Sequence, residues 1–104
     1  MAEPARTSTG APTVTETHPA WLARIHVTLK PVVLDPQGDA VLTGLHQLGF
    51  ANVASVRVGK YLEVAFAAAD QAAAEAAVTQ MCARLLANPV IESYRFTVEA
   101  HAAP

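Results

Sequence analysis

Alternation of hydrophobic and polar residues predicts β-strands in separate parts of the chain. Between about residues 22 and 30, Ile25, Val27 and Leu29 share one face of an extended chain, because successive strand residues point in opposite directions. The polar side chains between them share the other face. Similar alternation predicts further strands at residues 52–58, 61–66 and 90–99.

Two places in this pattern allow alternative interpretations. Gly59-Lys60 favours a tight hairpin turn between the second and third strands. The alternative is one long bent strand with the glycine at its bend. In the last strand, Ile91 falls on the face opposite to Tyr94. Either both faces are covered there, or a bulge near Ser93 resets the register.

Two segments with apolar residues at helical spacing separate the strands. The first follows Asp35, a preferred N-terminal cap, and Pro36, which suits the first helical position. It ends at Gly49, because glycine readily adopts the backbone conformation that stops a helix. The second begins after Asp70 and ends near residue 87, where an Asn-Pro pair terminates it.

The resulting order, β-α-β-β-α-β, is that of the ferredoxin-like α+β fold, an antiparallel sheet with two helices on one face. The opposite face would carry polar, charged and aromatic side chains: His26, Thr28, Lys30, Arg57, Tyr61 and Glu63. Such a face can meet water, and its aromatic and aliphatic parts can also pack on a second subunit.

At 104 residues the chain suffices for one domain. Hydrophobic residues make up 52% of it, but many are alanines, so the core has few large side chains and oligomerisation is favoured as a way to bury more surface. We expect residues 1–20 to form a disordered tail, residues 21–100 the α+β domain and residues 101–104 a frayed end. The first segment has too few large apolar residues to offset the entropy of ordering.

Charge and hydropathy argue against several partners. The formal net charge is −2 and no basic run occurs, so we expect neither nucleic acid nor a membrane surface as partner. No apolar stretch approaches the roughly 20 residues that span a membrane. The N-terminus lacks the hydrophobic core of a signal peptide. We therefore expect a cytoplasmic protein.

The residue types that carry chemistry do not form a recognisable site. None of the four histidines stands at metal-ligand spacing with another histidine, cysteine or acid. The single cysteine, Cys82, lies on a predicted helix and is interpreted as a buried or inert thiol. Asp35 and Asp39 lie near a helix N-terminus, where acids respond to the helix dipole. We predict no catalytic residue and no cofactor or metal bound by this chain.

A cluster of hydrogen-bond donors flanks Gly59. Arg57, Lys60 and Tyr61 either form a solvated hairpin end, in which Arg57 pairs across the strands with Glu63, or form a contact patch for an acidic surface or an anion. Their spacing alone does not separate these interpretations.

Three stretches together resemble a known family: Leu29-Lys30 through Leu34-Asp35-Pro36-Gln37-Gly38, then Val56-Arg57-Val58-Gly59-Lys60-Tyr61, then Asn88-Pro89-Val90-Ile91-Glu92-Ser93-Tyr94. In this order and with these intervals they resemble the small S subunit of phosphoribosylformylglycinamidine synthase, of the three-subunit bacterial and archaeal kind. The resemblance extends over about residues 24–99. The N-terminal tail and Gly44 depart from the family pattern.

The resemblance implies a non-catalytic subunit of a purine-biosynthesis ligase. The complex converts formylglycinamide ribonucleotide, glutamine and ATP (with magnesium) to formylglycinamidine ribonucleotide, glutamate, ADP and phosphate. The implied partners are a glutaminase subunit, which releases ammonia, and a large synthetase subunit, which uses ATP. The small subunit would bridge them, assist ammonia transfer, and form a homodimer or homotetramer.

The residues expected to face partners are Lys30, Arg57, Lys60, Tyr61, Asn88 and Glu92. Asp35 and Pro36 are expected to be structural, as the helix cap. An alternative function from a different class is a ferredoxin-like regulatory module that binds a small ligand at a dimer interface, near Gly59-Lys60.

Overall fold

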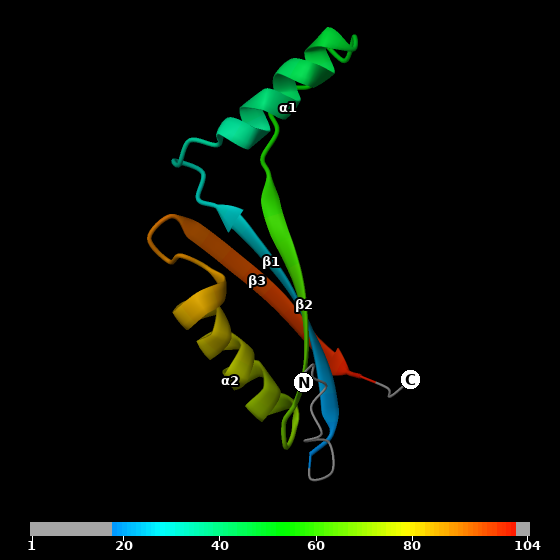
Figure 1. Ribbon diagram of the computed structural model, residues 1–104, viewed down its shortest axis with the longest axis vertical. Coiled ribbons are helices and arrows are strands. Elements are labelled where there is room, and N and C mark those ends of the chain that lie inside the picture. The colour runs from blue at the N-terminus through cyan, green and yellow to red at the C-terminus, as the bar shows by residue number, and fades with distance from the viewer. Residues whose placement is uncertain (1–17, 102–104) are drawn as a thin grey trace, which may run out of the picture.

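The computed structural model describes residues 18–101. Within this range an antiparallel sheet of three strands and two helices follow one another in the order β-α-β-α-β (Figure 1). The strands are β1 (Ala20–Leu29), β2 (Gly59–Ala67) and β3 (Glu92–Ala100). The helices are α1 (Pro36–Gln47) and α2 (Gln71–Met81), and a π-helical turn, η2 (Cys82–Leu86), continues α2.

The core lies between one face of the sheet and α2. β1 is the central strand, with β2 on one side and β3 on the other. Ile25, in the middle of β1, lies opposite Leu62 of β2 and Phe96 of β3. The predicted alternation along the first strand is confirmed, because Ile25 and Val27 are buried and Leu29 on the same face is half-buried. The core cluster consists of Ala23, Ile25, Val27, Val78, Cys82 and Ala87.

The predicted starts of both helices and the end of the first are confirmed, whereas the second ends as an α-helix at Met81 and continues as the π-helical turn η2 to Leu86. The carboxylate of Asp35 accepts a hydrogen bond from the Gly38 N–H, and Pro36 is the first residue of α1. Gly49 follows the helix with φ of +100°, a backbone conformation that glycine adopts without strain. Asp70 caps α2 by accepting from the Ala73 N–H at 2.8 Å.

The prediction of a fourth strand is wrong. Residues 53–58 form no strand, and Gly59 is the first residue of β2 rather than part of a hairpin turn. The physical reason lies in β1, whose pairing with β2 stops at Thr28 opposite Gly59. Beyond that point the first strand ends and Pro31, which has no N–H, turns the chain away. Residues before Gly59 therefore have no neighbouring strand to pair with.

The prediction that both helices cover one face of the sheet is also wrong. α2 lies beside the sheet, whereas α1 projects beyond the end at which β1 finishes and β2 begins (Figure 1). The chain then returns from the tip of α1 to β2. We call α1, together with residues 30–35 and 48–58, the arm. The ferredoxin-like order thus reduces to a smaller α+β unit with a projecting arm.

The first residues of β3 and β1 differ slightly from the predicted ones. Ile91 lies in the turn before β3, so its position opposite to Tyr94 requires neither a bulge nor a second covered face. β1 begins at Ala20, inside the range predicted as tail, while residues 1–17 and 102–104 lie outside the described residues. Neither helix of residues 18–101 is long and apolar enough to cross a membrane.

A glycine inside α1 gives a simple test of the helix. A Cβ placed on Gly44 would meet no atom within 4 Å, so Gly44→Ala is expected to stabilise the protein by about 0.5–1 kcal/mol through a lower entropy of the unfolded chain. Urea unfolding followed by circular dichroism measures this. The reciprocal control, Ala40→Gly on an exposed position of the same helix, should destabilise by a similar amount. Destabilisation by Gly44→Ala would contradict the open environment.

Candidate functional site

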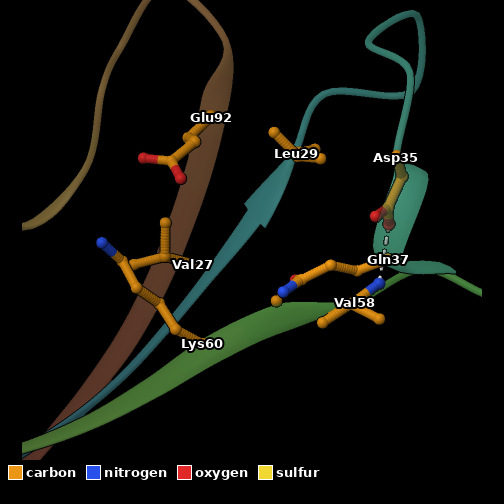
Figure 2. A pocket seen from close by; sticks show the side chains of 8 residues that line it. Val27, Leu29, Asp35, Gln37, Val58, Lys60 and Glu92 are labelled. Atoms are coloured by element: carbon orange, nitrogen blue, oxygen red, sulfur yellow. Dashed lines mark hydrogen bonds between the residues drawn. The ribbon is translucent and has the colours of Figure 1, made fainter.

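The three sequence stretches meet at one end of the sheet. There they surround a hollow of about 240 Å³, beside the base of α1. Figure 2 shows Lys60 and Glu92 extending along one side of it, while Gln37 and Val58 lie on another. We call this region the junction. The hollow is lined by Val27, Leu29, Asp35, Gln37, Val58, Gly59, Lys60 and Glu92.

Asp35 is the best-connected side chain of the junction. It is only 4% exposed. One carboxylate oxygen accepts from the Gly38 N–H at 2.9 Å. The other accepts from the Val58 N–H at 2.8 Å (Figure 2). These donors, Val58 first and Gly38 second, hold the pKa of the Asp35 carboxyl below its usual value of 3.8. The helix cap expected from the sequence thus also binds the returning chain.

Two glycines allow the backbones to approach closely here. A Cβ on Gly38 would overlap the carbonyl oxygen of Val56. A Cβ on Gly59 would lie 2.5 Å from the carbonyl oxygen of Val27. Both approaches are far closer than van der Waals contact, so each position accommodates only glycine without a shift of the backbone.

The side chain of Arg57 lies against the backbone of Lys30. The Arg57 Nη2 donates to the carbonyl oxygens of Lys30 and Val33, both at 3.0 Å. The N–H of Lys30 in turn donates to the carbonyl of Ile91 at 2.8 Å. The predicted pairing of Arg57 with Glu63 is wrong, because Arg57 lies outside the sheet.

Asn88 and Glu92 are also brought together, in the loop before β3. A side-chain oxygen of Glu92 accepts from the Asn88 N–H at 2.6 Å, and the Asn88 side chain accepts from the Val90 N–H at 3.0 Å. The backbone N–H of Glu92 donates to the Asn88 carbonyl at 2.7 Å. These contacts fix the loop that places the Glu92 carboxylate at the hollow.

Tyr61 lies on the opposite face of the sheet from Lys60. There its hydroxyl donates to Glu63 at 2.8 Å and accepts from Arg24 at 3.2 Å. Arg24 also pairs with Glu63 and with Glu99, each at 3.1 Å. The Tyr61 ring is 4.9 Å from that of His26. The sequence candidates are therefore divided between two sides of the molecule.

Sequence reasoning missed Arg24 and Glu99. The Glu99 hydrogen bond, followed by that of Tyr61, raises the pKa of Arg24, and Arg24 lowers the pKa of Glu99. Alternation along the first strand placed Arg24 on the same face as His26, and this was the feature of the sequence that could have identified Arg24. Its acidic partners can be identified only from the strand register, which places Arg24 opposite Glu63 and Thr97.

The junction holds backbone in place and has no arrangement typical of catalysis. Its polar contacts join side chains to peptide groups rather than a nucleophile to a base. Cys82 is fully buried, as expected, and burial raises the pKa of its thiol. Within residues 18–101 no three His, Cys, Asp or Glu side chains gather as metal ligands would.

The arm carries large apolar side chains that are open to solvent. Val32 is 91% exposed, Leu34 84%, Leu48 75% and Phe50 53%. Exposure of this extent on one projecting element is typical of a surface that another protein covers.

Comparison with known proteins places this geometry in a family. The family model described as "PurS: Phosphoribosylformylglycinamidine (FGAM) synthase" matches residues 22–100. This range includes the arm, the junction and all three strands except the first residues of β1.

The chain belongs to the PurS family. It is 53% identical over 81 residues to the phosphoribosylformylglycinamidine synthase subunit PurS of Synechocystis sp., with 78% of this chain and 81% of that protein covered. The relative from Bacillus subtilis is 46% identical over 79 residues, with 76% and 93% covered. The resemblance inferred from the three stretches is thereby confirmed.

Solved PurS structures share the fold. The structure of Thermus thermophilus PurS has a TM-score of 0.73 and 42% identity, and the match covers 81% of this chain and 100% of that one. A chain in the structure of PurLQS from Thermotoga maritima has a TM-score of 0.72 and 28% identity, with 78% and 99% covered.

Proposed function

We propose that this PurS chain is the non-catalytic bridging subunit of phosphoribosylformylglycinamidine synthase. The complex uses ATP and glutamine to form formylglycinamidine ribonucleotide in purine biosynthesis, in the cytoplasm. The chain would link the glutaminase subunit to the large synthetase subunit and assist the transfer of ammonia between them. The observation that carries the proposal is the family match over residues 22–100, together with the related chain in the structure of PurLQS from Thermotoga maritima.

The distribution of the candidate contacts supports a bridging role. Lys60 and Glu92 line the hollow, on the side of the sheet that faces α2, whereas Tyr61 lies on the other face. A subunit that joins two proteins needs contact residues on two sides. We propose that partners are contacted by Lys30, Arg57, Lys60, Tyr61, Asn88 and Glu92.

The exposed arm supports self-association. Its apolar residues, with Val41 45% and Val32 91% exposed, lie away from the small core that the sheet forms with α2. At about 25 cal/mol per Å² of apolar surface removed from water, covering them is favourable. We propose that a second copy of this chain covers the arm, in a homodimer or homotetramer.

The alternative, a regulatory module that binds a small ligand at a dimer interface, would need a second copy to complete its site, because the hollow of one chain at the junction is small. Its volume of about 240 Å³ is below the roughly 300–1,000 Å³ typical of small-molecule pockets. Lys60 and Glu92 bring opposite charges to the same side of it.

Reconstitution with two nitrogen donors tests the bridging role. Turnover is measured with the glutaminase and synthetase subunits, with and without this chain, using either glutamine or added ammonium. Omission is expected to reduce the glutamine-dependent rate to near background and to leave the ammonium-dependent rate unchanged, because only the first requires transfer between subunits. Adding the chain back should restore the glutamine-dependent rate. An unchanged glutamine-dependent rate on omission would contradict the proposal.

A further inference from the structure

We infer that Asp35 and Arg57 act together as positioning residues that fix the direction of the arm relative to the sheet, and that self-association through the arm depends on them. The assembly part of this inference rests on the proposed function. We call the two side chains and the peptide groups that they bind the clamp.

The clamp joins the outgoing and returning chains in both directions. Asp35, on the outgoing chain, accepts from the N–H of Val58 on the returning chain at 2.8 Å. Arg57, on the returning chain, donates to the carbonyl groups of Lys30 and Val33 on the outgoing chain at 3.0 Å. Each side chain therefore binds the segment that carries the other.

Side chains rather than backbone groups join the outgoing and returning chains here, because the two segments do not pair as strands. The outgoing segment contains Pro31 and Pro36, neither of which has an N–H to donate. Pairing between β1 and β2 stops at Thr28 and Gly59. A carboxylate, which only accepts, and a guanidinium, which only donates, supply the cross-links that the backbones cannot.

The clamp lies at the base of the arm, because Lys30 directly follows β1 and Val58 directly precedes β2. α1 projects away from the sheet (Figure 1), so its direction is set at its base rather than by packing along its length. Leu48 and Phe50 lie at the far end of the arm and are exposed. A small rotation at the base therefore displaces these apolar residues by a larger distance, away from the place where a second copy must receive them.

The chain offers a matched pair of variants to test this. Asp35→Asn keeps an oxygen to cap α1, because asparagine caps helices about as well as aspartate, but its amide cannot accept from both Gly38 and Val58. Asp70→Asn is the control, since Asp70 caps α2 through the Ala73 N–H and does not bridge to the returning chain. Arg57→Met breaks the other half of the clamp and serves if Asp35→Asn fails to fold.

Arm direction is measured with spin labels at Gln47→Cys and Thr97→Cys, one on α1 and one on β3. The buried thiol of Cys82 does not compete for the label. Labelled protein is diluted with an excess of unlabelled protein, so that only distances within one chain are recorded. Asp35→Asn and Arg57→Met should broaden the distance distribution, and Asp70→Asn should leave it unchanged.

Self-association is measured on the same variants by sedimentation velocity. Loss of a hydrogen bond to a charged group should raise the self-association Kd by roughly tenfold or more for the two clamp variants, with no change for Asp70→Asn. A distance distribution that stays narrow in folded clamp variants would overturn the inference, as would an unchanged Kd. Neither result bears on ammonia transfer, which the two-donor assay decides separately.

Discussion

Replacing Ile25 with alanine is expected to lower the free energy of unfolding by about 2–5 kcal/mol. The side chain is fully buried at the centre of β1, opposite Leu62 and Phe96 and within the cluster that includes Val78. Truncation removes its transfer free energy and leaves a cavity that neighbours fixed by strand pairing cannot fill. Since a small domain has only about 5–15 kcal/mol of stability in total, this is a large fraction of it.

Urea unfolding followed by circular dichroism measures the change. Leu85→Ala is the control, because Leu85 is 81% exposed and its truncation should alter the free energy by no more than about 0.5 kcal/mol. If Ile25→Ala cost as little as Leu85→Ala, the central position of Ile25 would be wrong. The comparison tests the core itself.

Replacing Gly38 with alanine is expected to destabilise the protein by about 1–3 kcal/mol through overpacking. The new Cβ would overlap the carbonyl oxygen of Val56 and lie 2.8 Å from a carboxylate oxygen of Asp35. The first of these contacts is with backbone, so the start of α1 or the returning chain must move. Movement of the helix start or of the returning chain should lengthen the hydrogen bond between the Asp35 carboxylate and the Val58 N–H.

The matched control is Gly44→Ala, the same substitution in the same helix at a position with no neighbour within 4 Å. In urea unfolding, the free energy of unfolding should therefore fall in Gly38→Ala and rise in Gly44→Ala. The amide proton of Val58, followed by NMR, should shift in Gly38→Ala and stay in place in Gly44→Ala. Equal effects of the two substitutions would contradict the close approach at the junction.

Local features of the fold were predictable because their causes lie within a few residues. Asp35 and Asp70 cap helices by binding an N–H three residues ahead, and Gly49 ends α1 through its own backbone conformation. The apolar face of β1 follows from alternation along a single strand. The motifs around Asp35, Arg57 and Asn88 likewise indicated the family without any knowledge of their arrangement.

For the candidate site, the sequence predicted which residues belong to it but not which groups they bind. The sequence indicated Lys30, Arg57, Asn88 and Glu92 as contacts for partners, but it did not indicate what they bind within the chain. In the structure Arg57 binds two backbone carbonyls, and Glu92 binds the Asn88 N–H. Periodicity assigns a side chain to a face, whereas these roles depend on which distant peptide group comes within reach.

The sequence by itself determined the starts of both helices and the end of the first, the buried face of the central strand and membership of the PurS family. Only the tertiary structure decided that residues 53–58 form no strand, that α1 projects as an arm, and that Asp35 binds Val58 as well as Gly38. The physical reason is the range of the interactions. Caps and alternation act between neighbours in the chain. A strand, by contrast, exists only where another strand lies beside it, and β1 ends before residues 53–58 could find one.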